Sequence, residues 1–176
     1  MKLISSIIIV FLLTAGISNS QTIKLSCSEK ERKNGEGKDP ILIQTCIIKN
    51  FKFVSTSYPD YAGRYVYSER EVYVRKNEKY IKTTYSKVFN NNQDELLATI
   101  NEKILQDFHN FRSDPNTKAC LTDLDSIPTY KMNDLEISFY NDDIWFEVHW
   151  GLSGACRNVD GTIVAFKVNE IKKYLN

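Results

Sequence analysis

The stretch Leu135-Glu-Ile-Ser-Phe-Tyr-Asn-Asp-Asp-Ile-Trp-Phe-Glu-Val-His-Trp150 decides the fold. Alternate residues are apolar on both sides of its central turn, Asn141-Asp142-Asp143. A period of two is typical of a strand with one buried and one solvated face. The stretch therefore predicts a β-hairpin in which Trp145, Glu147 and His149 share the face opposite the apolar one.

Strand patterns recur along the rest of the chain. They predict further strands at 22–25, 41–48, 47–56, 64–75, 79–88 and 162–168. Turn residues separate some of them, as at Lys76-Asn77-Glu78. Most of the chain is therefore expected to form antiparallel sheet.

One amphipathic helix interrupts the strands, over about residues 92–112. Its apolar positions recur at helical spacing: Leu96, Leu97, Ile100, Ile104, Phe108 and Phe111. Asn92 is a candidate N-cap with Glu95 three positions later, and Pro115 prevents continuation. Asn169 can cap a short C-terminal helix. Because no βαβ repeat occurs, we predict an α+β fold, an antiparallel sheet with this main helix packed on it.

Residues 1–20 have the pattern of a secretory signal peptide. Lys2 precedes an apolar run, and the small residues Ser18 and Ser20 precede Gln21. The run is much shorter than the ~20 apolar residues of a membrane-spanning helix. We predict cleavage before Gln21 and a single disulfide-bearing α+β domain over 21–176. This domain is expected to be secreted or periplasmic and not membrane-spanning after cleavage.

The charge balance limits the class of partner. Lys2 is the only charged residue before Gln21, so the predicted exported domain has equal numbers of basic and acidic side chains. A protein that binds nucleic acid is expected to carry a basic surplus. We therefore predict no nucleic-acid partner.

All four cysteines lie in the predicted exported domain. An even number in an oxidising compartment indicates two disulfides, for which three connectivities exist. The turn-rich segment 34–40 lies midway between Cys27 and Cys46, which would face each other across a hairpin. This symmetry favours Cys27 with Cys46 and Cys120 with Cys156. Zinc is disfavoured because the sequence has no closely spaced cysteine pair.

The string from His149 to Ala155 approaches the nucleophile elbow of serine hydrolases. With Asp160 nearby, Ser153 and His149 could be imagined as a triad. However, Ala155 replaces the last glycine of the motif and a loop replaces the required helix. A connecting loop pinned by a disulfide is the favoured interpretation.

Carboxylates and aromatic residues offer two further hypotheses. The carboxylates gather in the second half of the chain: Asp123, Asp125, Asp134, Glu136, Asp142, Asp143 and Glu147. A pair of them flanking a cleft could hydrolyse a glycan. Asp142 and Asp143 are also a candidate calcium site. However, most of these carboxylates are expected in turns, where Asp is favoured for its local hydrogen bonds. Aromatic residues could line a carbohydrate or peptide groove, although packing within the sheet is favoured: Tyr58, Tyr61, Tyr65, Tyr67, Trp145 and Trp150. His109 is expected to be a solvated helix residue.

Residues Gly63 to Leu175 resemble a known extracytoplasmic domain. The resemblance lies in the Lys87-Val-Phe89 junction into the helix, the hairpin from Glu136 to Phe146, and the closing segment from Asp160 to Leu175. These segments are similar to the C-terminal domain of RsiV-type anti-sigma factors, which also occurs beside some cell-wall polysaccharide deacetylases. The loop 151–156 and the disulfides depart from that pattern. The resemblance implies a non-catalytic binding or sensing domain and transfers no individual binding residue.

These observations lead to one expectation about function. We expect a secreted or periplasmic, non-enzymatic binding module for an unknown protein or glycan ligand, with no catalytic residue, metal site or cofactor. The alternative is a small hydrolase of peptidoglycan or another cell-envelope polysaccharide.

Overall fold

The computed structural model describes residues 22–35, 39–59 and 65–176. The predicted signal peptide lies outside these residues. The strands and the long helix are β1 (Leu25–Arg32), β2 (Ile41–Ile48), β3 (Phe51–Pro59), β4 (Tyr65–Lys76), β5 (Lys79–Thr83), α1 (Gln93–Ser113), β6 (Glu136–Tyr140), β7 (Asp143–Val148) and β8 (Thr162–Lys167). The predicted α+β class is confirmed.

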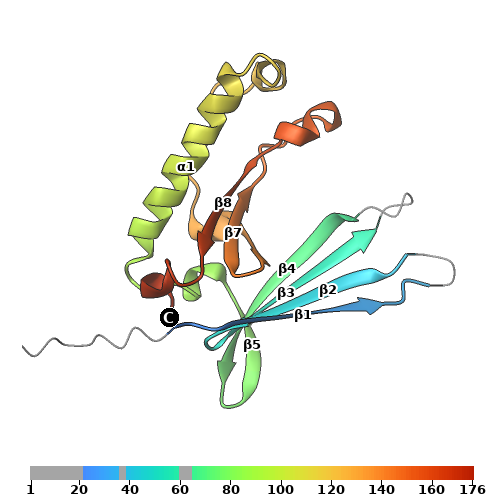
Figure 1. The fold of residues 1–176 in the computed structure, drawn as a ribbon, viewed down its shortest axis with the longest axis vertical. Coiled ribbons are helices and arrows are strands. Elements are labelled where there is room, and N and C mark those ends of the chain that lie inside the picture. Colours follow the sequence, from blue (N-terminus) through green and yellow to red (C-terminus); the bar gives the residue numbers. More distant parts are fainter. Residues whose placement is uncertain (1–21, 36–38, 60–64) are drawn as a thin grey trace, which may run out of the picture.

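The strands form two antiparallel sheets instead of one. The large sheet has the order β1-β2-β3-β4-β5, and the small sheet has the order β6-β7-β8. In Figure 1 the helix α1 runs beside the small sheet, while β1 to β4 of the large sheet project away from the helix. The sequence patterns predict strands but not how many sheets they form, because that depends on tertiary packing.

The core lies where the helix, the small sheet and one end of the large sheet meet. The helix contributes Leu96, Ile100, Ile104 and Phe108, all at most 2% exposed. Phe53 on β3 meets Phe139 on β6 edge-to-face, with 4.8 Å between ring centroids. This aromatic contact joins the two sheets inside one core.

The chain returns to its own start at the C-terminus. Asn169, expected to cap a helix, instead accepts a hydrogen bond from the Ile23 backbone N–H at 3.0 Å. The predicted C-terminal helix is a single 3-10 turn, η5 (Lys172–Tyr174). Phe89 and Leu175 form a β-bridge beside it.

Two local expectations hold only in part. Asn92 is the N-cap residue of α1, as expected, but its side chain makes no capping bond, and Glu95 pairs with Lys173 at 3.0 Å. The overlapping patterns at 41–48 and 47–56 conceal a tight turn, in which Lys49 has a φ of 51°. The turn at Lys49 contains no glycine or proline, and the Glu95–Lys173 pair joins residues far apart in the sequence, so local sequence patterns predict neither.

Both disulfides have the predicted pairing. Cys27 and Cys46 are directly opposed on β1 and β2, and Cys120 is bonded to Cys156. The second disulfide ties η2 (Lys118–Leu121) to η4 (Gly154–Val159), which follow α1 and β7 respectively. Disulfides persist in oxidising compartments. Within the described part of the chain, no helix has the length and apolarity needed to cross a membrane.

Candidate functional site

The small sheet has an inner face on the helix and an outer face directed away from it. Alternation along β7 sends Ile144, Phe146 and Val148 into the core. The outer face consists of Glu136, Ser138 and Tyr140 on β6, Asp143, Trp145 and Glu147 on β7, and Ile163, Ala165 and Lys167 on β8. His149 follows β7 directly. This arrangement brings Glu147 and His149 together, as the hairpin pattern predicts.

Arg70 on β4 connects this outer face to the large sheet. Its guanidinium bonds to the carboxylate of Glu136 and, through a second nitrogen, to Glu147 Oε2 at 3.0 Å. The Ser138 hydroxyl donates to Glu147 Oε1 at 2.5 Å. The Arg70 and Glu147 side chains are only 17% and 14% exposed. One guanidinium therefore holds two carboxylates in place, as charge-assisted pairs do.

Arg70 is the part of this cluster that the sequence analysis missed. It lies in an alternating strand, where a charged residue is expected to face solvent. Ser55 on β3 is its direct partner, and Phe53 and Val72 come next on the same face. On the core face of the large sheet, apolar residues are thus followed by Ser55 and Arg70, and Arg70 contacts the small sheet through Glu136 and Glu147. Only the docking of the two sheets reveals this, and no local pattern carries it.

Tyr85 lies at the base of the same cluster. Its ring stacks on Phe53, with centroids 6.3 Å apart. Burial raises the pKa of Tyr85 to about 12; Arg70 opposes this effect, and Glu136 adds to it. Its hydroxyl is buried and makes no hydrogen bond with the described residues. The phenol is therefore held neutral beside the Arg70 pairs.

His149 is positioned by the loop that leads into β8. Its Nδ1 lies 3.2 Å from the Asp160 carbonyl oxygen, and its Nε2 lies 4.0 Å from Glu136 Oε2. The Asp160 carboxylate accepts the backbone N–H groups of Trp150 and Leu152 at 3.0 and 2.9 Å. Asp160 therefore fixes the loop in which His149 lies.

Gly161 allows this loop to return so closely. Its φ is +113°, and a Cβ at this position would lie 1.9 Å from the Val148 carbonyl oxygen. A side chain at 161 would collide with the backbone of β7. The approach of β8 to the end of β7 therefore requires glycine.

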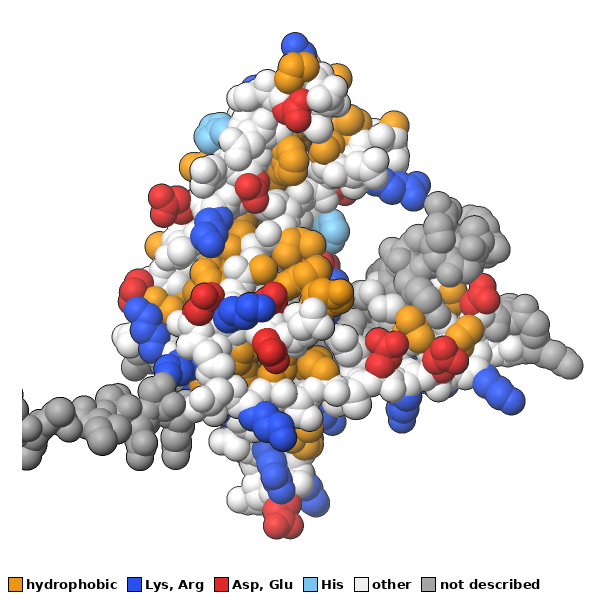
Figure 2. Space-filling model, in the orientation of Figure 1, with side chains coloured by type: hydrophobic (Ala, Val, Ile, Leu, Met, Phe, Trp, Pro, Cys, Tyr) orange, Lys and Arg blue, Asp and Glu red, His pale blue; other side chains and the backbone are white. Residues whose placement is uncertain are grey.

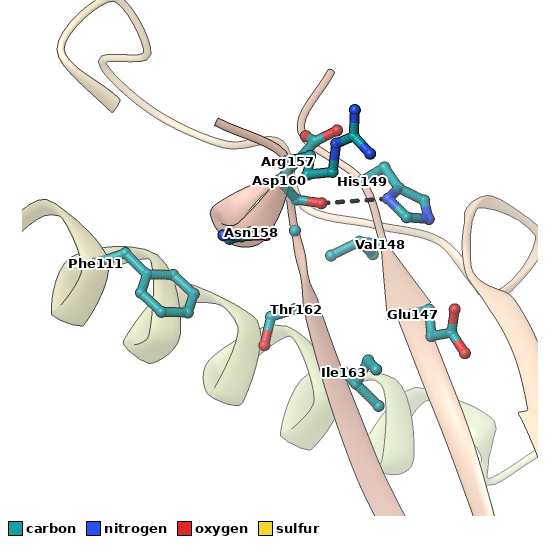
Figure 3. Close-up of a pocket in the computed structure, with 10 residues that line it drawn as sticks. Phe111, Glu147, Val148, His149, Arg157, Asn158, Asp160, Thr162 and Ile163 are labelled. Carbon is teal, nitrogen blue, oxygen red and sulfur yellow. Dashed lines mark hydrogen bonds between the residues drawn. The ribbon is translucent and has the colours of Figure 1, made fainter. Parts of the chain in front are cut away.

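A pocket opens at this end of the small sheet, with a cavity volume of about 320 Å³. Glu147, His149, Arg157, Asp160 and Ile163 are among its lining residues. In Figure 3, Glu147 and His149 point to the same side of β7, and Asp160 accepts across the gap to His149. Carboxylate and imidazole acceptors therefore lie beside a cation and an apolar side chain. Small-ligand pockets combine apolar lining with a few polar groups in this way.

The Glu136–Glu147–His149 cluster is also the candidate metal site among the described residues. One potential ligand atom from each lies within 4.8 Å of the others. The two carboxylates already bond to the guanidinium of Arg70, which is a cation. A metal ion would have to displace Arg70, so this donor set does not fit a resident metal.

The serine triad, which the sequence disfavours, is not assembled among the described residues. Ser153 precedes η4 and is exposed, and among the described residues its hydroxyl bonds to neither His149 nor Asp160. The Asp160 carboxylate is used by backbone N–H groups, as described above. The loop interpretation agrees with this geometry.

The remaining candidates are dispersed. Trp150 packs against Phe108 and Phe111 of α1, whereas Trp145 on the outer face contacts Tyr140, so the two tryptophans do not share a groove. Asp143 forms an ion pair with Lys167 at 2.8 Å, and His109 is exposed on α1. Tyr61 and the side chains of Tyr65 and Tyr67 lie outside the described part. The other carboxylates lie outside the strands of the small sheet, in turns, a short helix or irregular backbone: Asp123, Asp125, Asp134 and Asp142.

Comparison with known proteins yields no match to a family model, to a curated protein or to a solved structure.

Proposed function

We propose that this chain is a secreted or periplasmic, non-enzymatic binding module that holds its ligand in the pocket beside Glu147 and His149. The observation that carries the proposal is that the Arg70 guanidinium forms ion pairs with both Glu136 and Glu147. Paired ions of this kind make a rigid polar surface, which favours recognition. Both carboxylates pair with the Arg70 guanidinium, whereas hydrolysis of a glycan requires a carboxyl group directed at the scissile bond.

A glycan is the ligand that this pocket suits best. Sugar hydroxyls both donate and accept hydrogen bonds. Glu147 and His149 offer acceptors, Arg157 and Asn158 offer donors, and Ile163 offers an apolar contact. Pockets of about 300–1,000 Å³ are usual for small ligands, so the cavity has room for one or two sugar rings. A protein ligand would place a single side chain there.

The test is to titrate the exported protein with chito-oligosaccharides and with soluble peptidoglycan fragments, and to monitor the chemical shifts of its residues by NMR. We expect shifts centred on 147–163, and we expect Glu147→Gln or His149→Ala to weaken binding about tenfold, as for the loss of a ligand hydrogen bond. Glu102→Gln is the matched control, because Glu102 is exposed on α1 and makes no side-chain bond to other described residues. Unchanged affinity in both site variants would contradict the proposal.

The alternative hydrolase rests on the proximity of the Glu136 and Glu147 carboxylates. Zymography with peptidoglycan and other polysaccharides tests it, repeated with Glu147→Gln and Ser153→Ala. We expect no clearing zone from any of these proteins. A clearing zone that is lost with either substitution would contradict the binding module and support the hydrolase.

Export is the second part of the proposal, supported by two disulfides that suit an oxidising compartment. Mass spectrometry of the protein recovered outside the cytoplasm is expected to find Gln21 as its first residue. A chain that retains Met1 would contradict this.

A further inference from the structure

The charges of this chain are distributed unevenly. Residues 94–160 carry more than twice as many acidic as basic side chains. The opposite holds around the β4–β5 hairpin, where the basic residues are Lys49, Lys52, Arg75, Lys76, Lys79, Lys82 and Lys87. Three acidic residues offset them on the two strands and their turn: Glu69, Glu71 and Glu78. Figure 2 shows Lys and Arg side chains gathered on this projection at the bottom of the view.

The hairpin holds its cations close together. Lys76 and Lys79 are directly opposed next to a two-residue turn, Asn77-Glu78, in which both residues have positive φ. Arg75 and Lys82 lie on the other face of the hairpin. Like charges directly opposed across a strand pair are destabilising. An anionic partner would remove this repulsion.

Several of these cations are not neutralised within the described structure. Lys82 pairs with Glu71 at 2.6 Å, and Lys52 lies over the rings of Tyr73 and Tyr80, 4.6 Å from each centroid. Arg75, Lys76 and Lys79 are exposed, and their side chains form no ion pair or hydrogen bond with the described residues. They are therefore available to a partner.

An apolar side chain accompanies the cations. Ile81 is 51% exposed and lies on the same hairpin face as Lys76 and Lys79. Anionic headgroups attract lysines, and an apolar side chain gains by reaching the acyl boundary below them. A soluble polyanion would use the charges and leave Ile81 in water.

We propose that the β4–β5 hairpin docks the protein on an anionic phospholipid membrane, with Lys76 and Lys79 on the headgroups and Ile81 directed toward the acyl chains. This surface belongs to the large sheet and shares no residue with the pocket beside Glu147. It therefore holds whether or not the pocket binds a glycan.

Sedimentation with lipid vesicles tests the proposal. The exported protein is expected to bind vesicles of phosphatidylcholine mixed with phosphatidylglycerol, but not vesicles of pure phosphatidylcholine. It is expected to dissociate from the mixed vesicles as NaCl is added. Combining Arg75→Ala, Lys76→Ala and Lys79→Ala should lower the partition coefficient about a hundredfold, at about fivefold per lost cation. Ile81→Ser should lower it severalfold without changing the salt dependence.

The control variant removes equal charge elsewhere. Lys30, Lys33 and Lys118 are exposed and remote in sequence from the hairpin, so their combined change to alanine is expected to keep most of the binding. Near-ultraviolet circular dichroism verifies the fold of each variant. Equal losses in both triple variants, or salt-independent binding of the unchanged protein, would overturn the proposal. Binding to soluble polyphosphate without binding to vesicles would also overturn it and identify an anionic polymer as the partner.

Discussion

The two faces of the small sheet are built from alternate residues of the same strands, yet one is apolar and buried and the other carries charged pairs. On the inner face, Phe146 is fully buried between Phe89 and Phe166. On the outer face, Glu147 is held by Arg70 and borders the pocket. The inner face derives its stability from burial of apolar area, and the outer face arranges charges at a partly solvated boundary. Substitutions on the outer face therefore leave the apolar contacts of the inner face in place.

The largest expected effect separates two adjacent residues. Phe146→Ala should lower the free energy of unfolding by about 4 kcal/mol, because it removes buried area and leaves a cavity. Trp145→Ala, one position away on the outer face, should cost about 1 kcal/mol, because Trp145 is only partly buried. Urea unfolding of both variants provides the measurement. Equal losses would mean that the two faces do not differ in their contribution to stability.

Gly161 tests whether the outer face depends on a backbone constraint. Gly161→Ala should cost about 3 kcal/mol, combining strain at positive φ with the clash against the Val148 carbonyl. The loop that carries His149 and Asp160 must then move, so the NMR signals of the pocket should shift more than those of α1. Gly154→Ala is the control, because a Cβ there would meet nothing within 4 Å. A Gly161→Ala protein as stable as this control would contradict the close-approach argument.

Arg70 tests whether the outer face stabilises the contact between sheets. Arg70→Met should cost about 2 kcal/mol, less than for a fully buried pair, because it leaves two adjacent carboxylates without their cation. Adding Glu136→Gln and Glu147→Gln should restore most of the loss, since the uncompensated charges are then absent. Urea unfolding of the single and triple variants measures both effects. No recovery in the triple variant would contradict the role of Arg70 as the counter-ion of the two carboxylates.

The same two faces mark how far the sequence could predict the molecule. The period of two in 135–150 predicts the hairpin and places Trp145, Glu147 and His149 on one face, because strand geometry alone decides this. The spacing of Leu96, Ile100, Ile104 and Phe108 likewise predicts α1. Arg70 could not be predicted, since its partnership depends on how two sheets dock. Tyr85 is a similar case, because its burial follows from the position of Phe53.

The smallest expected effect concerns this tyrosine, which lies where the core meets the outer face. The pKa of Tyr85 is about 12 in the folded protein against the ordinary value of 10.0, so the folded state keeps the phenol proton that the unfolded state loses. The resulting stability is fully present below pH 10 and is lost as the pH rises toward 12. Because the Tyr85 residue as a whole is only partly buried, this loss is limited to about 1 kcal/mol. Tyr85→Phe should therefore fall less steeply in stability than the unchanged protein between pH 10 and 12, measured by urea unfolding. Tyr80→Phe serves as the control, because Tyr80 lies on the β4–β5 hairpin outside the core. Parallel pH profiles for Tyr85→Phe and the unchanged protein would mean that the phenol is solvated and that the core ends before Arg70.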